Sequence, residues 1–165
     1  MLVMNNKPEN IQKESIIEYG LMSIEILKFS LNETENVDIS IDKIGFELNL
    51  SGDFDETSSH IEVITDINIF KEKDKGRKRV AELKTKFVFF IKGADSLKED
   101  GNETYLPKKL IDSFNLISVS TTRGILFTKF QGTKIQNIIL PLISPKDLSL
   151  DLKINSKIIK KKKKA

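Results

Sequence analysis

Residues 115–148, NLISVSTTRGILFTKFQGTKIQNIILPLISPKDL, combine two patterns that decide the fold of this chain. Over the first half, apolar residues recur at every third or fourth position, which is typical of a helix with one apolar face. Gly132 follows the last of them and suits the left-handed conformation that ends many helices. The stripe consists of Leu116, Val119, Phe127 and Phe130, with Arg123 at the same spacing and Ile117 and Leu126 broadening it. These residues predict one long helix.

Beyond Gly132 the apolar residues are too crowded for a helix. Six of them fall within positions 135–143, namely Ile135, Ile138, Ile139, Leu140, Leu142 and Ile143. Pro141 lies among them and lacks the backbone N–H that a continuing helix would use. We therefore expect an extended segment that lies on the core.

Upstream of the helix, apolar and polar residues alternate, which is the pattern of half-buried strands. The segments are 24–31, 37–41, 46–50, 61–69 and 83–91. In the first of them the alternation changes parity near Leu27, which indicates a β-bulge with one extra residue. The segments 37–41 and 46–50 can be read as one bent strand or as two.

Short polar connections separate these segments. SGDFDETSS at 51–59 reads as a surface hairpin loop with Phe54 in its middle, and 71–79 reads as a charged turn around Gly76. A short helix over 106–114 should lead into the long one. Because no helix lies between the strands, we expect an α+β fold. It would be a four-stranded antiparallel sheet, with an extra short strand possible, and the long C-terminal helix packed on one face.

Length and charge indicate one domain with two tails. The chain has 165 residues and a net charge of +3, and a terminal cluster at Lys157 and 160–164 carries much of the positive charge. We expect a flexible N-terminus at 1–14, a single domain at 15–150 and a Lys-rich disordered tail at 151–165. Neither a signal-peptide pattern nor an apolar run of spanning length is evident, which favours a cytoplasmic protein.

The residue types argue against an enzyme. The chain has no cysteine and one histidine, His60, so thiolate chemistry and histidine-based metal sites are excluded. Asp53, Asp55 and Glu56 lack the ligand spacing of a calcium loop. No phosphate-binding loop, nucleophile elbow or zinc-protease motif occurs. We predict no catalytic residues, no metal and no cofactor.

Two hypotheses remain open for the basic clusters at 73–79 and at the C-terminus. One is nucleic-acid binding, which the interleaved acidic residues and the lack of accompanying aromatic residues disfavour. The other is a non-catalytic adaptor that binds one folded partner through the lysine tail. A solvated turn and a solubilising tail explain the same clusters without any partner.

The chain has ten phenylalanines. They supply more apolar surface than is needed to cover one face of a sheet. Candidates for a client-binding or oligomer surface are Phe46, Phe54, Phe70, Phe90, Ile125 and Phe127. Candidates for close approach of helices across a subunit interface are Ser118, Ser120, Thr121 and Gly124. An ordinary exposed helix face accounts for the small residues equally well.

Two short pieces of the chain resemble the SecB-like family of export and folding chaperones. Ile24-x-Ile26-x-x-Phe29-Ser30-Leu31 is similar to the first strand of that family. Gly132-Thr133, followed by an apolar run and Pro141, is similar to the family's Arg-Gly-Thr, Leu-x-Leu and Pro-Val-Asn sequence in the separation of glycine from proline. The resemblance covers roughly residues 23–148.

The resemblance implies a homo-oligomer, a dimer of dimers, that holds unfolded polypeptides in long apolar grooves without nucleotide. It also implies links to protein export or to a toxin–antitoxin pair. The strongly acidic surface with which the family meets the export motor is not evident here, which argues against that partner. The sequence thus predicts an ATP-independent holdase chaperone.

Overall fold

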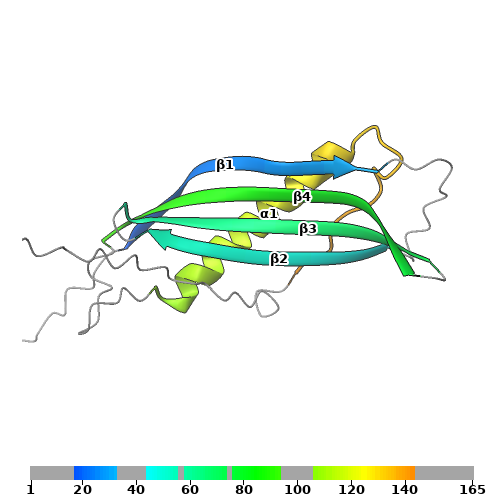
Figure 1. Cartoon of the computed structure of the whole chain (residues 1–165). Coiled ribbons are helices and arrows are strands. Elements are labelled where there is room, and N and C mark those ends of the chain that lie inside the picture. The colour runs from blue at the N-terminus through cyan, green and yellow to red at the C-terminus, as the bar shows by residue number, and fades with distance from the viewer. Residues whose placement is uncertain (1–16, 33–43, 56–57, 74–75, 94–105, 144–165) are drawn as a thin grey trace, which may run out of the picture.

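A computed structural model describes residues 17–32, 44–55, 58–73, 76–93 and 106–143. The elements are β1 (Glu18–Leu31), β2 (Ile44–Asp55), β3 (His60–Lys73), β4 (Gly76–Lys92) and α1 (Lys108–Phe130). The strands form one antiparallel sheet in the order β1-β4-β3-β2, and α1 crosses one face of it (Figure 1). This arrangement confirms the predicted α+β fold. The expected segment 37–41 and the tails at 1–14 and 151–165 lie outside the described residues.

The strands are longer than the alternation predicted. β2 continues to Asp55, and Phe54 pairs with Ile61 of β3 instead of lying in a surface loop. Phe54 is 1% exposed because its inward position at the end of β2 places it in the core. The expected turn at 71–79 is likewise mostly strand, since Glu72 pairs with Arg77.

Two irregularities bend β1, one between Leu21 and Ser23 and one between Ile26 and Lys28. The second confirms the bulge predicted near Leu27. The first was not expected. Each bulge leaves one apolar side chain, Met22 or Leu27, outside the regular pairing with β4.

A single helix replaces the predicted pair. It begins after Pro107 and runs without a break to Phe130, so the separate short helix over 106–114 is wrong. Phe114 and Asn115, where the two helices were expected to meet, are both buried and neither interrupts the helix. The predicted stop is confirmed, because Gly132 has a φ of +75° just beyond the end of α1.

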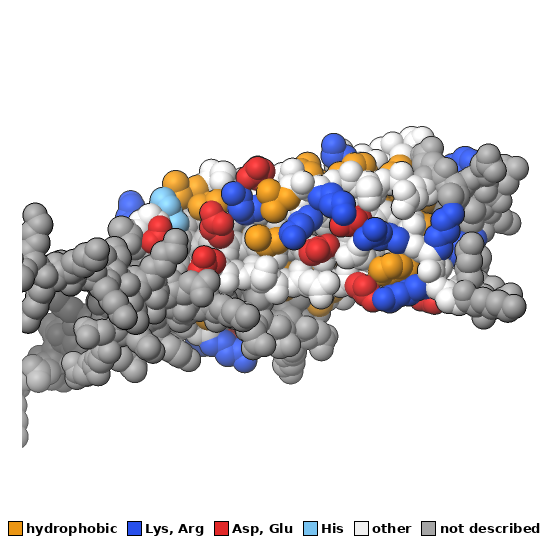
Figure 2. Space-filling model, viewed as in Figure 1, with side chains coloured by type: hydrophobic (Ala, Val, Ile, Leu, Met, Phe, Trp, Pro, Cys, Tyr) orange, Lys and Arg blue, Asp and Glu red, His pale blue; other side chains and the backbone are white. Residues whose placement is uncertain are grey.

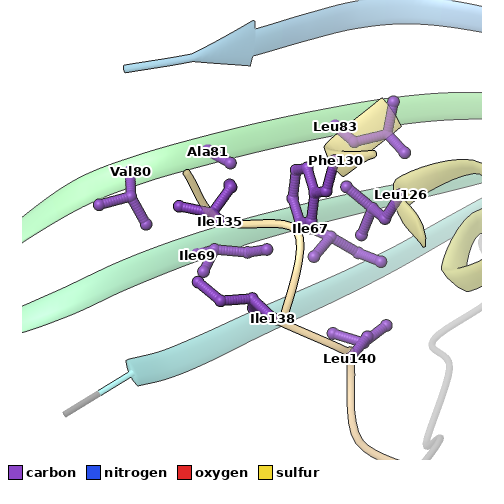
Figure 3. Packing of buried hydrophobic residues seen from close by; sticks show 10 residues of the cluster. All are labelled: Ile67, Ile69, Val80, Ala81, Leu83, Leu126, Phe130, Ile135, Ile138 and Leu140. Carbon is purple, nitrogen blue, oxygen red and sulfur yellow. The ribbon is translucent and has the colours of Figure 1, made fainter. Parts of the chain in front are cut away.

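Two separate apolar clusters hold α1 against the sheet. The first (cluster 1) lies under the start of the helix and includes Phe114, Phe87 and Phe89. The second (cluster 2) lies under its end and includes Leu126 and Phe130. The segment after Gly132 lies on the core as predicted, since its Ile135, Ile138 and Leu140 pack in cluster 2 against β3 and β4 (Figure 3). Its first part is not extended, because residues 134–137 form turns in which the Ile138 N–H donates to the Ile135 carbonyl at 2.9 Å.

Candidate functional site

The helix and the segment that follows it cover the inner face of the sheet unevenly. α1 makes its main contacts with the central strands β3 and β4. The segment beyond it then crosses toward β2, where Phe46 and Leu48 pack against cluster 2 (Figure 1). Among the described residues, none covers the first two-thirds of edge strand β1 to the same extent. Within the described part of the chain, this stretch of the inner face of β1 is therefore open.

Pairing with β4 shows which β1 side chains lie on this inner face. Leu21 pairs with Phe89, Ile24 with Phe87 and Ile26 with Thr85, and each of these β4 residues is buried beneath α1. The three β1 side chains share that face, yet they are 42–43% exposed. Met22 and Leu27, the extra residues at the two bulges, are 53% and 42% exposed.

Two contacts between β1 and α1 mark the ends of this open strip. At one end the rings of Tyr19 and Phe114 meet edge to face, with centroids 5.3 Å apart. At the other end the Lys129 ammonium lies 5.5 Å from the centroid of the Phe29 ring. Between these contacts, Leu21, Ile24 and Ile26 are the wall that β1 contributes.

The second wall comes from the side of α1 that carries Lys129. A hollow of about 420 Å³ is lined by Thr121, Gly124, Ile125, Thr128 and Lys129. Positions 121, 124, 125 and 128 fall on one helix face, and Lys129 connects that face to Phe29 of β1. Gly124 adds no side chain to this face of α1, and a β-carbon built on it would meet nothing within 4 Å. The hollow is lined by helix residues alone, and Lys129 links it to β1, so we call the exposed strip of β1 together with this face of α1 the β1–α1 groove.

The opposite face of the sheet is built differently. Charged side chains of both signs alternate along it (Figure 2). The Glu82 carboxylate forms ion pairs with Lys28 at 2.8 Å and with Arg79 at 3.1 Å. Glu25 lies 3.1 Å from Lys86, and the hydrogen bond from that ammonium raises the pKa of Lys86. An apolar segment that bound here would have to desolvate these charges at a cost in free energy, so this face is better suited to contact with water than to binding an apolar client.

The structure separates the predicted surface phenylalanines. Phe70 and Phe90 are half-buried on the charged face, where Arg77 lies 4.3 Å and Lys92 5.6 Å from their ring centroids. Phe46 is half-buried against cluster 2, and Phe54 is in the core and not on any surface. None of these four lines the β1–α1 groove.

The helix residues divide in the same way. Ile125 lines the groove and Phe127 is 49% exposed outside it. Of the small residues, Thr121 and Gly124 line the groove and Ser120 is exposed. Ser118 is completely buried against the chain's own sheet, so the expectation that it faces another subunit is corrected.

Sequence reasoning missed the β1 wall. The signal was present, because Leu21, Met22, Ile24, Ile26 and Leu27 place apolar side chains on both faces of one strand. That pattern was interpreted only as a bulge. It also marks an edge strand whose apolar side chains remain exposed.

His60 begins β3 and is half-buried. No group of three His, Cys, Asp or Glu side chains that could hold a metal ion occurs among the residues that the structure describes. Within the same ranges, no helix is both long enough and apolar enough to cross a membrane.

No family model matches the chain, and no curated protein matches it in sequence. Several solved structures match the chain, and two of them are the following. One is the Mycobacterium tuberculosis Rv1957 SecB-like chaperone in complex with a ChAD peptide from the Rv1956 HigA1 antitoxin, with a TM-score of 0.55 and 11% identity over 76% of this chain and 88% of that one. The other is a Streptococcus agalactiae protein of unknown function, with a TM-score of 0.43 and 9% identity over 78% and 99% of the two chains. The first likeness shows a SecB-like fold.

Proposed function

We propose that this protein is an ATP-independent holdase chaperone of the cytoplasm that binds extended apolar segments of unfolded polypeptides in the β1–α1 groove. The observation that carries the proposal is the exposure of Leu21, Ile24 and Ile26 on the same sheet face as a buried core. Contiguous exposed apolar surface of this kind commonly marks a binding site.

An extended client fits the shape of this groove. A strand presents every second side chain to one face, which matches a strip running along β1. Each apolar side chain that leaves water contributes about 25 cal/mol per Å² of buried area. β1 is also an edge of the sheet, so its backbone can pair with a client strand in addition to the side-chain contacts. Neither step requires nucleotide hydrolysis.

We further propose that the chain works as a homo-oligomer, a dimer of dimers. Several grooves acting on one client raise the effective concentration of each contact. Leu116 and Phe127 lie three helix turns apart on an exposed face of α1, with exposed Ser120 between them, and they are candidates for the subunit contact. Mass measurement in solution tests this part, with a tetramer expected and a monomer contradicting it.

Holdase activity of this kind can serve protein export or the control of a toxin–antitoxin pair. The chaperone of similar fold was solved with a peptide from an antitoxin. We therefore propose an extended antitoxin segment as the first client to test. No described surface of this chain supports the export motor as a partner.

Light scattering from a chemically unfolded client tests the function. The purified protein should suppress aggregation at a stoichiometric ratio without nucleotide, and a failure to do so contradicts the proposal. Truncation after Ser156 provides the control. A holdase that uses the β1–α1 groove keeps its activity without the tail, whereas an adaptor or nucleic-acid binder that depends on the lysines loses its partner.

A further inference from the structure

A layer of polar side chains separates the two apolar clusters beneath α1. Between Phe114 of cluster 1 and Leu126 of cluster 2, only one of the buried helix residues, Val119, is apolar. The members of this polar layer are Thr65, Thr85, Asn115, Ser118 and Thr122, each at most 1% exposed. Thr65 and Thr85 are cross-strand partners in the middle of β3 and β4. The centre of the helix therefore rests on hydroxyl and amide groups instead of hydrocarbon.

Much of this layer has no partner within the described part of the chain. The hydroxyls of Thr85 and Thr122 lie 2.8 Å apart, and Thr122 also donates to the Ser118 carbonyl at 2.8 Å. The hydroxyls of Thr65 and Ser118 and both side-chain atoms of Asn115 lack a hydrogen-bond partner. Water satisfies such groups whenever the helix separates from the sheet, so closure of the helix over this layer is disfavoured locally.

The helix itself is weakest at the same place. Residues 118–124 read SVSTTRG, in which every residue except Arg123 is a poor helix former. The bond from Thr122 to the Ser118 carbonyl is of a kind that often bends helices. Gly124 adds backbone freedom and has no neighbour that would resist a change of direction.

We infer that residues 118–124 form a hinge at which α1 opens locally, while its two ends stay anchored in clusters 1 and 2. Leu110 and Phe114 hold the first half, and Leu126 and Phe130 hold the second. The hinge opens without unfolding either cluster. Thr121 and Gly124 also line the β1–α1 groove, so opening changes the shape of its helix wall. The hinge itself does not depend on the proposed function.

Hydrogen exchange on the full chain, without any client, tests the hinge. Amides at 118–125 should have protection factors at least about tenfold below those of the flanking turns at 112–116 and 127–130, because the local opening needs less free energy than release of either cluster. Equal protection along the whole helix would overturn the inference.

A pair of helix-strengthening substitutions supplies the second measurement. Ser120→Ala with Gly124→Ala changes two exposed positions outside the polar layer, and the added methyl on Gly124 meets no neighbour. Protection at 118–125 should rise roughly tenfold, as the summed helix propensities predict. Ser113→Ala, outside the hinge, should leave that protection unchanged. A rise of the same size in both variants, or in neither, contradicts a hinge at 118–124.

Discussion

The ring of Tyr19 meets the ring of Phe114 edge to face, with centroids 5.3 Å apart and planes inclined at 89°. Tyr19 belongs to the exposed edge strand and Phe114 to the buried side of the helix. The contact fixes one end of β1 to α1 although the side chains that follow on β1 remain open. The Tyr19–Phe114 contact therefore marks one end of the β1–α1 groove.

Removal of that ring should loosen the groove. Tyr19→Ala is expected to lower the free energy of unfolding by about 1 kcal/mol, the size of an aromatic pair contact. Tyr19→Phe keeps the ring and should unfold like the wild type in urea. The interpretation is wrong if the alanine and phenylalanine variants have the same midpoint.

Gly20 should not tolerate a side chain. A β-carbon at this position would lie 2.6 Å from Cε1 and 2.9 Å from Cζ of Phe90, so the ring would have to move. We expect Gly20→Ala to cost about 1 kcal/mol of unfolding free energy. Adding Phe90→Leu should recover part of the loss, since the smaller side chain leaves room. Equal stability of Gly20→Ala and the wild type would contradict this packing.

The two cross-strand threonines of the polar layer should respond differently to replacement by valine. The Thr65 hydroxyl is buried without a partner, so Thr65→Val should raise the unfolding free energy by about 1 kcal/mol. The Thr85 hydroxyl bonds Thr122, so Thr85→Val should lower it or leave it unchanged. Chemical denaturation of both variants measures these changes. A loss of stability in Thr65→Val would contradict the conclusion that the Thr65 hydroxyl is buried without a partner.

The Lys86–Glu25 ion pair should make the free energy of unfolding depend on pH in the alkaline range. Its hydrogen bond and charge interaction with Glu25 raise its pKa in the folded state above the ordinary value of 10.5. Because the folded pKa is the higher one, the pair stabilises the protein fully below that ordinary value and loses its effect as the pH rises through the raised pKa. The stability difference between wild type and Lys86→Gln should therefore shrink above about pH 10.5. A difference that grows with pH would contradict this sign.

Much of the fold was predictable because its signals are local. The parity change near Leu27 indicates the bulge directly, and Gly132 marks the end of the helix. The turns at 134–137 were not predicted, because the crowded apolar residues there resemble an extended chain. The predicted surface position of Phe54 was wrong. Its glycine and aspartate neighbours resemble a loop, whereas pairing with Ile61 of the neighbouring strand decides where Phe54 lies. A long-range partner of that kind leaves no local trace.

The groove could not be placed from sequence for a related reason. Which edge of the sheet stays open depends on the direction that the chain takes after Gly132. Among the described residues it turns toward β2, so the first two-thirds of β1 remain uncovered. The apolar side chains of both edges look alike in the sequence, and Phe46 of β2 was preferred to Ile24 of β1 although only the latter stays exposed.

Binding of a fluorescent apolar peptide with one binding segment to matched variants tests whether the β1–α1 groove holds clients. Ile24→Asp places a charge on the β1 wall, and Leu142→Asp places the same charge on an exposed apolar residue outside the groove. Circular dichroism should show both variants folded. If the groove binds the peptide, Ile24→Asp should weaken binding by at least about tenfold, or 1.4 kcal/mol, while Leu142→Asp should bind like the wild type. Wild-type affinity in Ile24→Asp would contradict it.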